Sequence, residues 1–366
     1  MTREKRDESA PPLPFLPCDL ILNILSWLPV KSILRFKCVC KSWLTLFTNP
    51  DFVKKHLSQS QNHKLIVSCE FDNFFSVTCE NHDPRPIRNI NSEIRGLKVN
   101  ILGSCDGLVL NGTGADAGAG AGASNRLYLL NPTTEKFNRL PVLPSPIEQL
   151  TASYGFGYDA SIDDYKVVAI SSSLIGVSYF ETITSVYTLK TNSWRRIQVE
   201  TLEVVLPIGG SAGILLHGVL HWLRPHWSNI VCFDLVQEKF QYMPLPADLQ
   251  INPSSSGLTC GVLRGCLCIS FIIQDQTNTK FSGEFWVMKE YGKRESWTNI
   301  WSTPAFDSIK SLNFSNSDKE DLFLVNKKWL DGYNVEKNSL RRYPANYSMV
   351  SPKCEAEIYL ESMVSP

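Results

Sequence analysis

The sequence has no net charge, no long hydrophobic run and no regular cysteine framework. Its 36 Lys and Arg balance its 36 Asp and Glu, which argues against broad electrostatic capture of nucleic acid or of an anionic membrane. No apolar run approaches the ~20 residues of a membrane-spanning helix. The opening run MTREKRDESAPPLP lacks the apolar core of a signal peptide. The eleven irregularly spaced cysteines therefore predict reduced thiols in the cytoplasm or nucleus.

A short polar segment precedes the first organised part of the chain. Residues 1–14 carry charges of both signs and three prolines, which predicts a disordered leader. Residues 15–57 then place apolar side chains at helical spacing. Four of them recur every four residues in the first expected helix: Leu16, Leu20, Ile24 and Leu28. Pro29 ends that helix, two more periodic stretches follow, and Asn49-Pro50-Asp51 begins a last short helix.

These helices carry more apolar surface than they can cover by themselves. The apolar side chains of the first helix extend well beyond the ~100° stripe that a surface helix needs. A segment of about 40 residues is also near the lower size limit for independent folding. Either the helices cap the rest of their own chain, or another protein covers them.

The order of the residues favours a partner protein. The run LPCDLILNILSWLPVKSILRFKCVCKSWLTLFTNPDFVKKHL resembles a plant-type F-box over its whole length. This resemblance implies docking on the Skp-type adaptor of an SCF ubiquitin ligase, with cullin and RING subunits beyond. It also implies which positions contact the adaptor: Leu16, Pro17, Leu20, Ile24, Leu25, Leu28, Pro29, Ile33, Leu34, Val39 and Trp43. Some of these side chains must instead form the core of the segment itself.

The charge of this segment has a simple interpretation. Residues 15–57 hold six Lys and Arg against two Asp. A basic cluster can bind nucleic acid, but a solvated helix face is the more common reason for one. Because the adaptor family is acidic, the charge can also steer association. We expect no nucleic-acid partner and no membrane partner.

From residue 64 the pattern changes to short alternating strands, so this part is expected to be all-β. A strand, a polar turn, an apolar anchor and a basic or proline exit recur along it. The anchors are spaced 43 to 57 residues apart: Phe137, Trp194, Phe240, Trp297 and Leu340. A strand-built period near ~50 residues is kelch-like and predicts the blades of a propeller.

Counting residues 64–90 as a first unit gives six units. The fold class expected is therefore an α+β multidomain protein, a small helical segment followed by a six-bladed β-propeller-like domain over residues 64–366. The terminal run EAEIYLESMVSP alternates apolar and polar residues, and its pairing with the first unit would close the ring. Closure would hide the open sheet edges that invite aggregation. Two packed β-sandwiches are the competing architecture.

A second resemblance covers the β part. The stretches SCDGLVLNG, LLNPTTEKFNRLP, YGFGYDASIDDYKVVAI and EIYLESMVSP are similar to the plant F-box-associated domain, which follows the F-box in S-locus and constitutive-defence-type F-box proteins. The run GTGADAGAGAGAS over residues 112–124 departs from that pattern. Its composition predicts a flexible inserted loop.

A propeller would bind a target through the loops between its strands, because the strands are committed to packing. Aromatic and basic residues at three such places are the candidates: Phe74, Phe75, Tyr179, Phe180, Arg224, His226 and Trp227. Each could equally serve packing within a blade. The sequence does not identify the protein target.

Signals for catalysis and for cofactors are weak. Residues 209–213 satisfy G-x-S-x-G around Ser211, but a nucleophile elbow needs a helix after it and the next residues are typical of a strand. His217 and His221 lack further ligands at zinc spacing, and His221 beside Trp222 is typical of a packed histidine. We expect no metal and no cofactor.

The sequence therefore predicts a non-catalytic substrate-recognition subunit of an SCF ubiquitin ligase, acting in the cytoplasm or nucleus. Two alternatives stay open. One is a free-standing β-propeller scaffold capped by its own helices, and the other is a serine hydrolase that uses Ser211.

Overall fold

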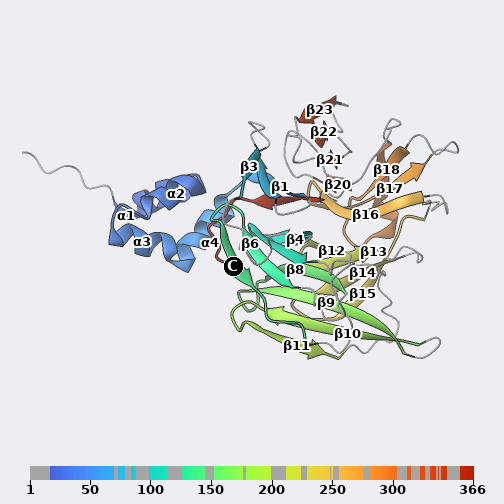
Figure 1. Ribbon diagram of the computed structural model, residues 1–366. Coiled ribbons are helices and arrows are strands. Elements are labelled where there is room, and N and C mark those ends of the chain that lie inside the picture. Colours follow the sequence, from blue (N-terminus) through green and yellow to red (C-terminus); the bar gives the residue numbers. More distant parts are fainter. Residues whose placement is uncertain are drawn as a thin grey trace, which may run out of the picture. The chain divides into compact units, whose positions relative to one another are not determined.

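A computed structural model gives the architecture (Figure 1). It describes residues 17–69, 73–78, 84–87, 99–113, 126–144, 152–175, 179–198, 212–223, 229–247, 249, 255–274, 281–302, 311–314, 322–325, 330–334, 337, 339–343 and 355–366. The chain divides into two compact units, a helical unit over residues 1–60 and a β unit over residues 61–366. The expected leader at residues 1–14 lies outside the described residues.

The helical unit contains four short helices: α1 (Cys18–Ser26), α2 (Val30–Phe36), α3 (Lys41–Thr48) and α4 (Pro50–Gln59). Pro17 and Pro29 stand directly before α1 and α2, where extended backbone and a missing N–H are tolerated. Asn49 caps α4, because its side-chain oxygen accepts a hydrogen bond from the backbone N–H of Asp51 at 2.7 Å. No helix in the described ranges is long and apolar enough to cross a bilayer.

An aromatic chain fills the core of the helical unit. Neighbouring rings meet edge to face along Phe36, Trp43, Phe47 and Phe52, with centroids 5.3 to 5.7 Å apart. The smaller core residues Leu25, Val30 and Ile33 are buried beside them. His56 of α4 is also buried, and its Nε2 lies 2.8 Å from the carbonyl oxygen of Leu28. These contacts tie α4 to the end of α1.

The strands of the β unit form antiparallel sets of four. The first three sets are, from the innermost strand outward, β24 (Glu355–Leu360), β1 (His63–Cys69), β2 (Asn73–Thr78) and β3 (Pro84–Pro86); β4 (Val99–Cys105), β5 (Leu108–Thr113), β6 (Leu127–Asn131) and β7 (Lys136–Arg139); β8 (Ser153–Asp159), β9 (Asp164–Ile175), β10 (Tyr179–Thr188) and β11 (Ser193–Ile197).

The other three sets follow in chain order. They are β12 (Ala212–Leu216), β13 (Val219–Leu223), β14 (Asn229–Asp234) and β15 (Phe240–Pro244); β16 (Ser255–Leu263), β17 (Cys266–Gln274), β18 (Phe281–Met288) and β19 (Trp297–Ser302); β20 (Ser311–Phe314), β21 (Leu322–Val325), β22 (Leu330–Asn334) and β23 (Ser339–Tyr343). A short parallel bridge between β8 and β12 joins the third and fourth sets into one eight-stranded sheet.

The innermost strands close a ring. They contact one another in the cyclic order β24, β4, β8, β12, β16 and β20, and β20 contacts β24 again. The expected pairing of the C-terminal strand with the first unit is confirmed, since β24 runs antiparallel to β1 from His63 opposite Leu360 to Ser68 opposite Glu355. Such a ring of small sheets is propeller-like and is incompatible with two packed β-sandwiches.

The sequence repeat has a physical basis in contacts between neighbouring sets. All five anchors lie on the outermost strands, or directly at their start. The indole N–H of Trp194 donates to the carbonyl oxygen of Pro141 at 2.8 Å, and that of Trp297 donates to Pro244 at 3.1 Å. These two tryptophan anchors thus bind the proline exit of the preceding set. At these two places the anchor and the exit are joined by one hydrogen bond, whereas Phe137, Phe240 and Leu340 have no side-chain donor for such a bond.

Tight hairpin turns explain why a glycine stands directly before the second strand of several sets. Asp106-Gly107 connects β4 to β5, His217-Gly218 connects β12 to β13, and Arg264-Gly265 connects β16 to β17. Both residues of each pair have positive φ, from 50° to 85°. Two-residue turns of this kind match the twist of antiparallel strands and favour glycine in the second position.

The interpretation of residues 112–124 as a loop needs a correction at its start. Gly112 and Thr113 belong to β5 and are buried, and Gly112 pairs with both Asn100 and Leu127. A Cβ at Gly112 would lie 2.8 Å from Leu102, so this glycine is explained by close packing. The remaining residues of the predicted loop lie outside the described ranges.

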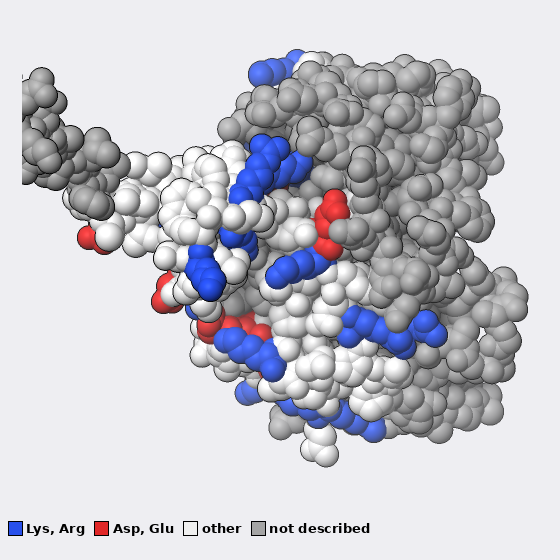
Figure 2. Space-filling view, turned by 60° about the vertical axis from the view of Figure 1, so that its left-hand side comes forward, with Lys and Arg blue, Asp and Glu red and all other residues white. Residues whose placement is uncertain are grey.

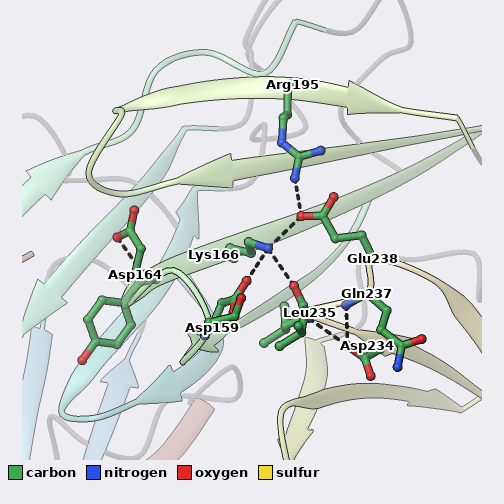
Figure 3. A network of polar contacts seen from close by, with 11 residues as sticks. Asp159, Asp164, Lys166, Arg195, Asp234, Leu235, Gln237 and Glu238 are labelled. Carbon is green, nitrogen blue, oxygen red and sulfur yellow. Dashed lines mark hydrogen bonds and ion pairs between the residues drawn. The ribbon is translucent and has the colours of Figure 1, made fainter.

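A buried ionic network joins the third set to the fourth (Figure 3). The side chain of Lys166 on β9 is 5% exposed, and its Nζ lies 2.6 Å from Asp159 and 2.7 Å from Glu238. It also donates to the carbonyl oxygen of Leu235 at 2.7 Å, and Arg195 pairs with the same Oε1 atom of Glu238. Burial opposes ionisation of Asp159, but the hydrogen bonds from Lys166 and Ser161 outweigh it and lower its pKa.

We predict that Lys166→Met destabilises the β unit strongly. The substitution keeps the length of the side chain but leaves Asp159 ionised in the interior without its cation, which should cost ~3–5 kcal/mol of the free energy of unfolding. Urea unfolding at neutral pH measures the change. Lys190→Met is the matched control, because Lys190 pairs with Asp163 at the surface, and its loss should cost about 1 kcal/mol or less. Equal effects of the two substitutions would contradict the assignment.

Candidate docking surfaces and the central channel

Helix α1 presents an uncovered apolar face. Leu20, Ile24 and Trp27 are 49%, 56% and 68% exposed, and their spacing of four and then three residues places them on one side of the helix. We call these three residues the docking stripe. Figure 2 shows that the part of the helical unit facing the viewer is largely uncharged. Single exposed apolar residues are ordinary, but a contiguous group of large ones indicates a binding surface.

The structure sorts the predicted adaptor contacts into groups. Five are exposed: Pro17, Leu20, Ile24, Pro29 and Val39. Three are partly covered: Leu28, Leu34 and Trp43. Leu16 lies outside the described residues.

Two of the predicted contacts need a correction. Leu25 and Ile33 are 5% and 0% exposed, since they pack in the core of the helical unit with Val30 and Phe47. They support the docking surface from beneath and have no area to offer a partner.

Two exposed residues were missed by sequence reasoning. Trp27 continues the line of Leu20 and Ile24, and its position three residues after Ile24 was a readable signal. Leu44 of α3 is 46% exposed, but its exposure depends on how α3 packs and has no signal in the sequence.

The predicted target contacts fall at sheet connections. Phe74 and Phe75 lie on β2, and Tyr179 and Phe180 begin β10; the structure describes the backbone of these four residues. Arg224, His226 and Trp227 lie outside the described residues, between the end of β13 and the start of β14. Each of the three places adjoins the connection between the second and third strands of its set.

A cavity of about 300 Å³ lies inside the ring, and we call it the central channel. Its walls come from residues 103–105 of β4, 213–215 of β12, 260–262 of β16 and residues 357, 358 and 360 of β24. These segments come from four of the six innermost strands, which are distant from one another in the sequence. Sequence reasoning therefore gave no signal of the channel.

Two carboxyl groups of the channel have raised pKa values. Burial raises the pKa of Glu357 to about 7, although the hydroxyl of Ser104, 3.2 Å from its Oε1, acts in the opposite direction. Burial also raises the pKa of Asp106, against the hydrogen bonds from Tyr165, at 3.1 Å, and from Cys105. In both cases the protein interior disfavours the charge.

The residues that could suggest catalysis are explained in other ways. His221 has structural hydrogen-bond partners, and Ser211 does not stand in a strand–turn–helix. Nδ1 of His221 lies 3.1 Å from the carbonyl oxygen of Ile214, and Nε2 lies 2.8 Å from the hydroxyl of Tyr291. Burial lowers the pKa of His221 to about 4, so it is a neutral packed histidine as predicted. Ser211 lies outside the described residues, and the strand β12 follows it where a nucleophile elbow needs a helix.

Comparison with known families matches both units. Residues 13–55 match the F-box domain, and residues 57–343 match the F-box associated beta propeller domain. The chain belongs to the F-box proteins that carry this propeller domain. The F-box therefore contains the docking stripe, and the F-box-associated domain contains the central channel.

Relatives in Arabidopsis thaliana support the same family. The F-box/kelch-repeat protein At3g23880 is 30% identical over 96% of this chain and 96% of its own length. The F-box protein CPR1 is 29% identical over 95% of this chain and 88% of its own length. Among solved structures, the tricorn protease is similar with a TM-score of 0.42 and 13% identity, covering 76% of this chain and 25% of that one. That likeness is too low to say anything about activity.

We predict that Glu357→Gln removes a pH-dependent loss of folding stability from the F-box-associated domain. Because the folded pKa of Glu357 is raised, the native state holds its proton more tightly than the unfolded state does. Stability is therefore lost as the pH rises from about 5 through about 7. The difference in free energy of unfolding between the variant and the wild type should therefore shift by ~2 kcal/mol in favour of the variant as the pH rises from 5 to 8. Urea unfolding at each pH measures it. A difference between the two proteins that does not change with pH would contradict the prediction.

Proposed function

We propose that this F-box protein is the substrate-recognition subunit of an SCF-type ubiquitin ligase. One observation carries the proposal: the region that matches the F-box contains the docking stripe, whose three large apolar side chains are exposed to solvent. The F-box would bind a Skp-type adaptor, and through it cullin and RING subunits. The F-box-associated domain would bind a protein target.

The proposed role needs no catalytic side chain in this chain. Holding a target near a ubiquitin-charged partner raises its effective concentration, and proximity alone can supply several kcal/mol of a reaction barrier. The protein then acts as an adaptor that binds the Skp-type subunit and the target at the same time, without a cofactor of its own. A reducing compartment, cytoplasm or nucleus, fits this role, and every cysteine whose side chain the structure describes is a free thiol.

The adaptor interface should depend on a few anchors. Large side chains near the centre of an interface contribute ~2 kcal/mol or more each, while the rim mainly excludes water. Ile24 lies between Leu20 and Trp27 on the stripe, so we place the centre there. We expect Pro17, Pro29 and Val39 to form the rim, with Leu28, Leu34 and Trp43 partly covered behind it.

The target would be held by the F-box-associated domain, through the connections between the second and third strands of its sets. In a propeller-like ring all such connections lie on one face. The candidate residues at β2, at β10 and between β13 and β14 would then share a single surface. The β unit itself starts at the other end of its first set, since His63 pairs with Leu360 at the end of β24. The candidate target residues and the first residue of β1 would thus lie at different ends of the sheets.

We predict that Ile24→Asp abolishes binding to a Skp-type adaptor. A carboxylate in the centre of an apolar interface should weaken the dissociation constant by at least about 30-fold, the equivalent of ~2 kcal/mol. Calorimetry with the full chain and purified adaptor measures it. Ile162→Asp is the matched control, because Ile162 is 49% exposed in the other unit. Full binding by Ile24→Asp would overturn the proposal in favour of a free-standing scaffold capped by its own helices.

We predict that the target and adaptor functions separate by mutation. A combined Phe75→Ala, Phe180→Ala and Trp227→Ala variant should lose the proteins that accumulate near the wild type when the proteasome is inhibited. The same variant should keep its adaptor, because these residues lie outside the F-box. Proximity labelling of the full chain, with and without proteasome inhibitor, reports both partners together. Unchanged accumulation would place target binding on another surface of the domain.

A further inference from the structure

The central channel contains ionisable groups that the proposed function does not use. Its lining residues include five with ionisable side chains: Glu357, Asp106, His63, Cys105 and Cys260. No Lys or Arg occurs among these described lining residues. The channel is thus a partly apolar chamber with acidic groups and without a built-in cation.

The size of the channel suits a small organic molecule. Its volume of about 300 Å³ is at the lower end of the range for small-molecule sites. Gly103, Gly213 and Gly261 form part of the wall, so backbone takes the place of side chains there and leaves the volume open. Ile214 and Val262 line the same space and offer apolar contact area.

The chemistry of Glu357 indicates what such a molecule should carry. Its carboxyl group has one described hydrogen-bond partner, the Ser104 hydroxyl, and that hydroxyl lies closer to the carbonyl oxygen of Ile358, at 2.6 Å. A hydroxyl has a single proton to donate, so the carboxylate is weakly compensated. Partial burial of a carboxylate without a cation disfavours its charge, and a bound cation would offset that cost.

A metal ion fits these surroundings less well than an organic cation does. Across the described residues, no group of three or more His, Cys, Asp or Glu could hold a metal. An ammonium group needs only one carboxylate and a few oxygen acceptors, and Ser104 and the carbonyl of Ile358 stand beside Glu357.

We propose that the central channel of the F-box-associated domain binds a small organic amine, whose ammonium group pairs with Glu357 and whose apolar part contacts Ile214 and Val262. The inference does not depend on the adaptor or on a protein target. The two proposals can therefore fail independently.

Binding by this pairing is linked to protonation. Near neutral pH Glu357 is partly protonated, so an arriving cation must displace a proton. The ionised fraction rises about tenfold between pH 6 and pH 8, and the affinity should rise with it. Other titratable groups face the same space: His63 from β1, Cys105 and Asp106 from the end of β4, and Cys260 from β16.

Benzylamine, benzyl alcohol and benzoate are probes of equal shape and different charge. Calorimetry with the full chain at pH 8 should give at least tenfold tighter binding of benzylamine than of either other probe. Its affinity should fall about tenfold at pH 6. His63→Gln should keep this pH dependence, which would assign it to the carboxyl group. No binding of benzylamine at millimolar concentration, or equal binding of the alcohol, would mean a water-filled channel only and would overturn the proposal.

Two variants localise the site. Glu357→Gln should lose at least tenfold in benzylamine affinity together with the pH dependence, whereas Glu290→Gln at the surface should change neither. Val262→Phe should abolish binding by filling the channel while it keeps the carboxyl group. Thermal unfolding checks that each variant is folded. Retained affinity in both channel variants would place the amine elsewhere and refute the assignment.

Discussion

Ring closure by β24 is the constraint on which the rest of the β unit depends. This strand pairs with β1 and so completes the first set. It also contacts β4 and β20, the innermost strands of the neighbouring sets. The residues after it are buried as well. Glu361 forms a buried ion pair with Lys64, and Asn131 donates to the carbonyl oxygens of Ser362 and Val364 at 3.2 and 2.7 Å. Without this segment the first set would lose its innermost strand, and the channel would lose the carboxyl group of Glu357.

The two units solve the problem of exposed edges and faces differently. The β unit closes its inner edge on itself, and charged residues such as Arg195 and Arg196 on β11 protect an outer edge. The helical unit uses its row of aromatic rings and Leu25, Val30 and Ile33 as a core, and its described residues, 17–60, include no further element that covers the face of α1 with Leu20 and Ile24. The same small size that limits its core therefore leaves its docking stripe available. The exposed apolar face results directly from an incomplete core.

Local signals made much of the fold predictable from the sequence. Pro17, Pro29 and Asn49 determine where helices begin, and glycine-containing turns and alternating apolar residues determine the hairpins. The sides of α1 were harder to predict. Leu25 is buried and Ile24 is exposed, although both are apolar and adjacent, because long-range packing, such as that of α4 on α1, decides which side is covered.

Long-range contacts were beyond the reach of the sequence. The pairing of Lys166 with Glu238 and the approach of Ser104 to Glu357 each join residues far apart in the chain. No periodic pattern encodes such partners, and the carboxyl groups involved look like any others in the sequence. The anchors Trp194 and Trp297 are intermediate cases, since their repeat was visible while the proline carbonyls they bind were not.

Closure by β24 also has a consequence for synthesis of the protein. A ribosome delivers β1 early and β24 after every other described strand, so the first sheet must wait through nearly the whole of translation for its innermost strand. Until then its inner edge offers unpaired N–H and C=O groups to any neighbouring chain. The F-box helices rely on local contacts and can form while the chain is still growing. A nascent chain would thus have a folded F-box before its propeller has closed. During that interval the unpaired edge of the first sheet would have to be protected from other chains.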